Sequence, residues 1–140
     1  MPDLRLKKTE FWRMKEFAKD KMRLEHIAEA IERLQTHAGN LSKAELRKDV
    51  LRYYGIVKNI EIIGEAARML TDEFKSAHPE VQWRNIAGMR NFLVHEYFNV
   101  DEETVYEVIH AEIPVLKEQV IGFINTIDWK HWESQPEKYL

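Results

Sequence analysis

The spacing of the apolar residues constrains this chain most, because almost all of it repeats with the period of an α-helix. No stretch alternates apolar and polar residues for long enough to form a strand. The 140 residues suffice for one buried core. We therefore predict a single all-α domain, an up-down bundle of four to five helices. The clearest apolar stripe, on the first helix, is Phe17, Leu24, Ile27, Ile31 and Leu34.

Capping signals predict the limits of the first two helices. Gly39-Asn40 is typical of a helix end, and Ser42-x-x-Glu45 is a capping box that opens a second helix. The apolar stripe of that helix continues to about Phe74, a length on the order of 50 Å. Mid-helix Gly64 indicates a close contact with another helix, and we expect Glu65 to pair with an arginine or a helix end.

The length of this second helix also bears on assembly. A helix of that length would extend beyond a compact bundle and expose an apolar end. We therefore expect a homodimer.

The second half of the chain contains a motif helix and a long last helix. His78-Pro79 breaks the chain, and a short segment follows at residues 83–86. The motif helix is predicted from about Ala87 to Phe98. Asp101 can cap the last helix, which Pro114 should kink.

Charge and composition limit the location and the partners. The chain has no cysteine and no apolar run long enough to span a membrane, so we expect a soluble, cytoplasmic protein. Residues 1–20 form a basic N-terminal extension, and a basic arm could follow a nucleic acid backbone, although a solvated helix face is the simpler interpretation. Residues 128–140 are expected to form a loosely docked polar tail.

The motif Arg90-x4-His95-x-Tyr97 carries the chemistry. Arginine offers a charged planar fork that suits phosphate, and histidine titrates near neutral pH. On an ideal helix Arg90 and His95 point about 140° apart. Either Arg90 lies in a first turn from which its side chain swings round, or two chains share one cleft across a two-fold axis.

By spacing alone this motif is weak evidence for catalysis. The structural alternative is an arginine that pairs with a helix end and a histidine that packs in the core. His95-Glu96 begins a zinc-binding motif, but Asn99 stands where the second histidine is needed. We therefore expect neither a metal nor a cofactor.

Longer stretches around the motif resemble the HepT-like family of HEPN-domain toxins. The similarity covers about two thirds of the chain, from about Lys21 to Val120. Four segments carry it: Ile62–Leu70, Pro79–Asn91, Leu93–Asp101 and Ile113–Leu116.

The resemblance implies an all-α dimer that cleaves RNA without a metal. Arg90 would bind the scissile phosphate and stabilise the transition state, and His95 would act as general acid or base. Asn91 would position the substrate. Tyr97 matches the tyrosine that a cognate MNT-type nucleotidyltransferase antitoxin modifies with AMP, which would silence the toxin.

Two alternatives remain open at this level. The chain could be a non-catalytic helical module that binds nucleotide or a nucleotidyltransferase partner. The partner could instead be the toxic component, with this chain as its activator or substrate.

Overall fold

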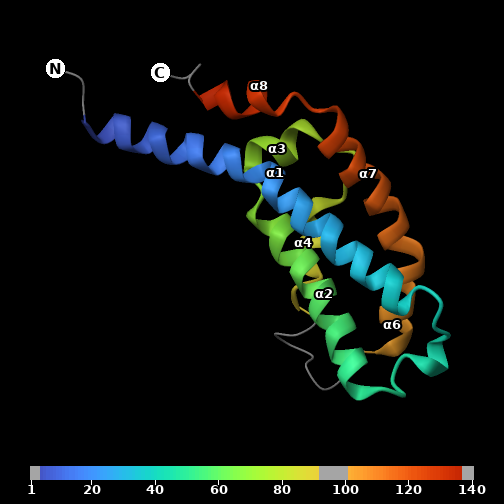
Figure 1. Ribbon diagram of the computed structural model, residues 1–140. Helices are drawn as coiled ribbons and strands as arrows, with labels where there is room; N and C mark the ends of the chain where they lie inside the picture. Colours follow the sequence, from blue (N-terminus) through green and yellow to red (C-terminus); the bar gives the residue numbers. More distant parts are fainter. Residues whose placement is uncertain (1–3, 92–100, 137–140) are drawn as a thin grey trace.

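The computed structural model is all-α, as the apolar periodicity predicts (Figure 1). It describes the backbone of residues 4–91 and 101–136, and the side chains of residues 11–91 and 101–136. In chain order the elements are α1 (Leu4–Ala38), η1 (Lys43–Glu45), α2 (Val50–Met69), α3 (Asp72–Ala77), α4 (Trp83–Gly88), α6 (Glu102–Glu107), η2 (Val108–Glu112), α7 (Ile113–Thr126) and α8 (Trp129–Ser134).

The core lies between α1, α2 and α7. Helix α1 packs along α2 on one side and along α7 on the other, and α4 packs on α2 (Figure 1). All five residues of the apolar stripe predicted for the first helix are buried. The prediction for the core face of that helix is therefore confirmed.

The long helix of the bundle is α1, and the prediction of a long second helix is wrong. The capping box at Ser42 and Glu45 is present, but it opens only the short 3-10 helix η1. Asp49 then supplies a second N-cap, where its carboxylate accepts a bond from the Arg52 amide, and Thr71 supplies a third for α3. These extra caps divide the segment, so α2 has 20 residues, or about 30 Å.

The first turns of α1, before the buried Phe17, project beyond the body of the bundle (Figure 1). With 35 residues α1 is about 52 Å long, far longer than its partner α2. At the other end Gly39 follows the helix directly, and a Cβ there would lie 2.6 Å from the Gln35 carbonyl oxygen. The predicted end of the first helix is thus confirmed, and the close backbone approach requires glycine.

The last long helix is capped and interrupted where the sequence predicts. The Asp101 carboxylate accepts a hydrogen bond from the Glu103 amide at the start of α6. The chain then passes through a π-helical turn, η2, immediately before α7 and its Pro114. Proline has no N–H to continue the helical ladder, and a widened turn accommodates that loss.

Residues 129–136, the described part of the predicted loose tail, are docked on the bundle. Asp128 caps the short helix α8. Trp132 is buried in α8, where its ring stacks on Phe17 with centroids 5.1 Å apart. Its Nε1 donates to Asp20 Oδ2 at 3.0 Å. Trp132 therefore joins α8 to α1 through one ring contact and one hydrogen bond.

Within the described ranges, no helix combines the length and apolar character needed to cross a bilayer.

Candidate functional site

Arg90 lies in a turn after α4 and not inside one straight motif helix. Helix α4 extends to Gly88, and Met89 and Arg90 form a turn in which the Arg90 amide bonds to the Ala87 carbonyl at 3.4 Å. A motif helix that begins at Ala87 is therefore wrong. The backbone returns to helical geometry at Asn91. The ideal-helix angle of about 140° between Arg90 and His95 has two possible explanations, and this placement supports the one in which the Arg90 side chain swings round from a turn. A residue in a turn is not fixed to one face of a helix.

Gly64 of α2 allows the backbone of this turn to approach α2 closely. A Cβ at Gly64 would lie 2.5 Å from the Arg90 amide nitrogen and 3.0 Å from the Ile86 carbonyl oxygen. Both atoms belong to the backbone, so no side-chain rotation could relieve the clash. The predicted close contact at Gly64 is confirmed, and its partner is the backbone of the candidate phosphate-binding arginine.

Glu65, the next residue of α2, holds the Arg90 side chain. Its Oε2 lies 3.3 Å from Arg90 Nε, and its Oε1 accepts a 2.7 Å bond from Arg68 Nη2. The predicted pairing of Glu65 with an arginine is confirmed. The hydrogen bond from Arg68, and the charges of both arginines, lower the pKa of the Glu65 carboxyl. The carboxylate therefore stays ionised between two cations.

This arrangement suits an anion that bridges two cations. The Arg90 side chain is 38% exposed, so a solvent-borne phosphate can reach it. A guanidinium has five N–H donors, and contact with Glu65 through Nε leaves others for a ligand. Arg68 is exposed on the same helix face, one turn beyond Glu65. Two arginines on one carboxylate thus create a small cationic surface.

The remaining predicted site residues are only partly within the described ranges. Asn91 is exposed and directly follows Arg90. His95 and Tyr97 lie outside the described residues, so their geometry is not part of the site described above.

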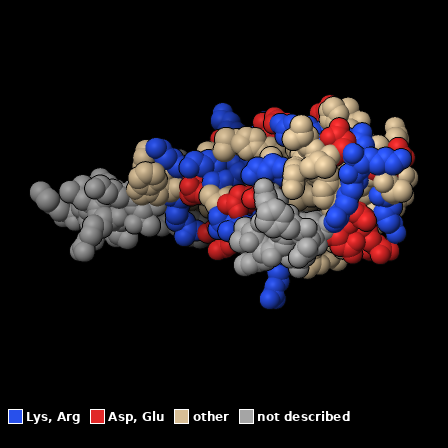
Figure 2. Space-filling view, turned by 90° about the horizontal axis from the view of Figure 1, so that it is seen from below, with Lys and Arg blue, Asp and Glu red and all other residues tan. Residues whose placement is uncertain are grey.

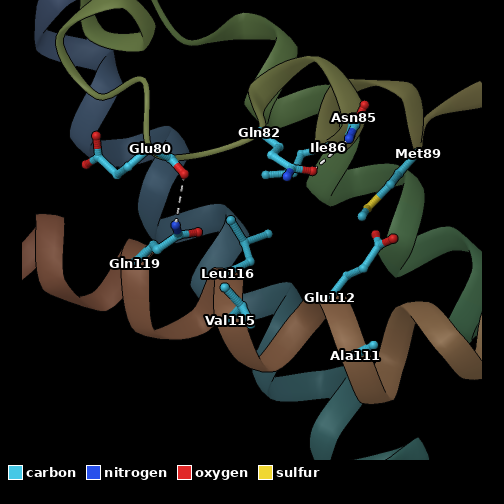
Figure 3. Close-up of a pocket in the computed structure, with 10 residues that line it drawn as sticks. All are labelled: Glu80, Gln82, Asn85, Ile86, Met89, Ala111, Glu112, Val115, Leu116 and Gln119. Atoms are coloured by element: carbon cyan, nitrogen blue, oxygen red, sulfur yellow. Dashed lines mark hydrogen bonds between the residues drawn. The ribbon is translucent and has the colours of Figure 1, made fainter.

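A cleft of about 240 Å³ lies on the other side of α4, between α4 and the η2–α7 region (Figure 3). Met89, Gln119 and Glu112 are among its lining residues, and the Glu112 side chain points across it toward Met89. Gln119 Nε2 donates to the Glu80 carbonyl at 3.5 Å. Two glutamates, Glu80 and Glu112, line the cleft, so it is a poor site for a phosphodiester.

Among the described residues, no group of three or more His, Asp or Glu side chains is placed to hold a metal ion.

Comparison with known proteins identifies the family. The family model "Ribonuclease HepT-like" matches residues 27–122, which is more than half of the chain. The chain belongs to this family. Its HepT-like segment contains Gly64, Glu65, Arg68 and Arg90, whereas the N-terminal half of α1 and all of α8 lie outside it.

Curated relatives carry matching names. The chain is 42% identical over 97 residues to a "Putative RNase" of Caldanaerobacter subterraneus subsp. tengcongensis, covering 69% of this chain and 87% of the relative. It is 38% identical over 94 residues to "Probable ribonuclease HepT" of Thermococcus cleftensis, covering 67% and 86%. A "Putative RNase" of Methanocaldococcus jannaschii is 31% identical over 108 residues, covering 77% and 89%. No solved structure matches the chain.

Arg68 is the site residue that the sequence analysis missed. Its position three residues after Glu65 on one helix face is a signal for an ion pair, and that spacing could have indicated it. The backbone contact between Gly64 and Arg90 joins residues 26 positions apart. No local sequence pattern identifies Arg90 as the partner of Gly64.

Proposed function

We propose that this HepT-like protein is a metal-independent RNA endonuclease. The observation that carries the proposal is Arg90, a half-exposed arginine fixed by the Glu65 carboxylate and by the Gly64 backbone contact. A cation that is held in place before substrate arrives stabilises developing negative charge without reorganising. The family to which the chain belongs supports RNA as the substrate.

The proposed reaction is an internal transfer followed by release of one strand. The ribose 2′-oxygen attacks the adjacent phosphorus, and the bond from phosphorus to the 5′-oxygen breaks. His95 takes the 2′-OH proton or gives a proton to the leaving 5′-oxygen. Arg90 binds the non-bridging phosphate oxygens, and Asn91 positions the RNA. The products are a 2′,3′-cyclic phosphate and a 5′-hydroxyl.

The same chain would act as the toxin of a type VII-like HEPN/MNT toxin–antitoxin pair. A cognate MNT-type nucleotidyltransferase would transfer AMP from ATP to the Tyr97 hydroxyl, with pyrophosphate as the leaving group. The added phosphate brings negative charge near Arg90, where it competes with RNA. Cytoplasmic location follows from this proposal, because the RNA and the ATP are there.

A homodimer is the proposed working form. The length of α2 no longer supports this, but its N-terminal end does expose apolar side chains. Leu51 is 84% exposed, and Val50 and Tyr54 beside it are also exposed. Apolar side chains gathered at one helix end are typical of an interface.

Cleavage of single-stranded RNA in the presence of EDTA tests the proposal. We expect 2′,3′-cyclic phosphate ends, and we expect Arg90→Ala and His95→Ala each to lose most of the activity while keeping the parent's helical circular dichroism. Cleavage that stops with chelator and returns with a divalent metal would refute the mechanism. RNA binding without cleavage would favour the non-catalytic module.

Mass spectrometry after co-expression with the cognate nucleotidyltransferase tests the regulation. We expect one or more AMP masses on the peptide that contains Tyr97, and none on Tyr97→Phe. AMP on another residue would refute the role of Tyr97 and leave the nuclease proposal intact.

A further inference from the structure

The projecting first turns of α1 carry an exposed aromatic pair. Phe11 is 54% exposed and Trp12 is 59% exposed, with ring centroids 6.2 Å apart in an edge-to-face arrangement. Lys15 Nζ lies 4.8 Å from the Phe11 ring centroid and 5.2 Å from that of Trp12. Large aromatic side chains are costly to expose, so this cluster of two rings and a cation indicates a binding surface.

We call residues 11–23 the arm, and its outward charge is positive. Asp20 and Arg23 are buried against the body and do not contribute to the outer surface. The remaining charged residues of the arm are one glutamate, Glu16, and four cations: Arg13, Lys15, Lys19 and Lys21. Figure 2 shows Lys and Arg side chains gathered where the arm meets the body, with fewer acidic side chains between them.

A groove lies between the arm and the C-terminal end of α2. Trp12 and Arg13 of the arm line one side of a groove of about 570 Å³, and Arg68 of α2 lines it as well. Three acidic residues also line the groove, and each is paired with a cation: Glu16 with Lys19 and Arg23, Asp72 with Lys75, and Glu73 with Arg13. Arg68 in turn shares the Glu65 carboxylate with Arg90, so Arg68 lies between the groove and the proposed cleavage site.

We propose that the arm binds single-stranded RNA, with a base stacked on the Phe11–Trp12 pair and phosphates at Lys15 and Arg68. This proposal rests on the proposed ribonuclease function, because it extends the same substrate from Arg90 along Arg68 to the arm. Aromatic rings stack on any base, and neighbouring cations contact the backbone, which is how proteins hold single strands without sequence preference.

The chemistry of the surface favours RNA over other partners. Three of the outward cations are paired with carboxylates, Arg13 with Glu73, Lys19 with Glu16 and Lys21 with Glu25. Cations still outnumber acidic residues on the arm, so a polyanion complements its charge, and a base complements the exposed rings. The arm lies in the part of α1 that precedes the family match at residue 27, so it adds to a fold that already contains Arg90. The arm thus serves as a second contact for a strand that is cut elsewhere.

Fluorescence anisotropy with a labelled oligouridine of about 12 nucleotides tests the proposal, in an Arg90→Ala background that prevents cleavage. The double change Phe11→Ala/Trp12→Ala should weaken binding about tenfold or more, because each lost stack removes a substantial contact. Lys15→Gln should reduce the slope of log K against log salt by about one. Both variants should keep the parent's circular dichroism, because the altered side chains are exposed or half-exposed.

Matched controls separate the arm from general charge and apolar surface. Lys48→Gln removes an exposed lysine near the start of α2, and Val115→Ala shortens an exposed apolar residue of α7; neither should change affinity. Trp12→Phe keeps a ring, so affinity should hold while the quenching of tryptophan fluorescence by RNA is lost. Equal affinity of the double variant and its background would overturn the proposal.

Two further measurements identify a different partner of the arm. Binding to phosphatidylserine vesicles, or a change of molecular mass in the double variant with no change in RNA affinity, would also overturn it.

In the cleaving protein, the double variant should raise KM for the oligonucleotide and leave cleavage of a dinucleotide unchanged. A parent that never cleaves, with affinity that still depends on the arm, would refute the ribonuclease function alone.

Discussion

At the scale of single residues, Glu65 holds the side chain of Arg90, the proposed phosphate-binding residue. The carboxylate contacts Arg90 through Nε and takes a shorter bond from Arg68. It fixes the direction of the guanidinium, and it also competes with phosphate for the same cation. Glu65 is therefore a positioning residue whose removal should affect the rate and the affinity differently.

Glu65→Gln should lower kcat by about tenfold without raising KM, because a misdirected Arg90 loses transition-state stabilisation while the competing negative charge disappears. Steady-state cleavage of a short RNA measures both parameters. The control is Glu61→Gln, one turn earlier on α2, where the carboxylate pairs with Lys58 at 3.0 Å. An equal loss of kcat in both variants would show that Glu65 acts only through surface charge.

At the scale of elements, two contacts between helices each depend on one residue: a glycine without a side chain, and a buried aspartate. Gly64 lets the turn after α4 approach α2, and Asp20 links α1 to the start of α3 and to α8. The first contact positions the proposed site, and the second joins the N-terminal half of α1 to the C-terminal helix.

Gly64→Ala should lower the free energy of unfolding by about 1–3 kcal/mol and reduce cleavage, because the new Cβ overlaps the Arg90 backbone and forces the turn away. Denaturant titration and cleavage assays measure these effects. Gly55→Ala is the matched control on the same helix. A Cβ there meets nothing within 4 Å, so alanine should stabilise the helix by about 0.5–1 kcal/mol. Equal behaviour of the two variants would refute the steric role of Gly64.

Asp20→Asn should cost about 1–3 kcal/mol of stability at neutral pH, because the buried carboxylate accepts three hydrogen bonds that an amide cannot all accept. Thr71 donates its amide at 2.9 Å and its hydroxyl at 2.6 Å, and Trp132 donates Nε1 at 3.0 Å. Urea denaturation measures the loss. Glu25→Gln, on the exposed face of α1, should change stability little.

The difference in stability between the parent and Asp20→Asn should change with pH in one direction. Burial raises the pKa of Asp20 above its ordinary value of 3.8, so the folded protein holds this proton more tightly than the unfolded chain. Its titration contributes stability below 3.8, and this contribution is lost as pH rises through the folded-state pKa. The difference in unfolding free energy between the parent and Asp20→Asn should therefore shrink as pH rises from 3.8 to the folded-state pKa. A difference that grows would contradict the raised pKa.

At the scale of the whole molecule, two groups of exposed apolar side chains among the described residues carry the proposed interactions. One is the N-terminal end of α2 around Leu51, and the other is the arm with Phe11 and Trp12. We assign the first to a second copy of the chain and the second to RNA. The two assignments are independent, because changes at one place should leave the other partner unaffected.

Leu51→Glu should convert the proposed dimer into a monomer, because it introduces a charge at the most exposed apolar residue of α2. Light scattering at micromolar concentration measures the mass. The control Val115→Glu places the same charge on α7 and should leave the mass unchanged. A parent that is already monomeric would refute the dimer, and a dimeric Leu51→Glu would place its interface elsewhere.

Local sequence patterns were enough to predict the helical class, the buried stripe of α1, the cap at Asp101 and the disruption at Pro114. These features depend on local patterns: a 3.6-residue period, a side chain that reaches a nearby amide, and a residue without an N–H. Gly64 and Glu65 were also recognised, because a mid-helix glycine beside a charge is a local signal. The identity of their partner was not.

The lengths of the helices and the partners across the fold depend on how the helices pack together. A second and a third N-cap outcompeted continuation of the apolar stripe, so α2 is short and α1 is long. Trp132 meets Asp20 across 112 positions, and Arg90 meets Gly64 and Glu65 across about 25. Such contacts depend on how whole helices pack, because burial and the pairing of polar groups select the partner, and neither is encoded in the spacing along the chain.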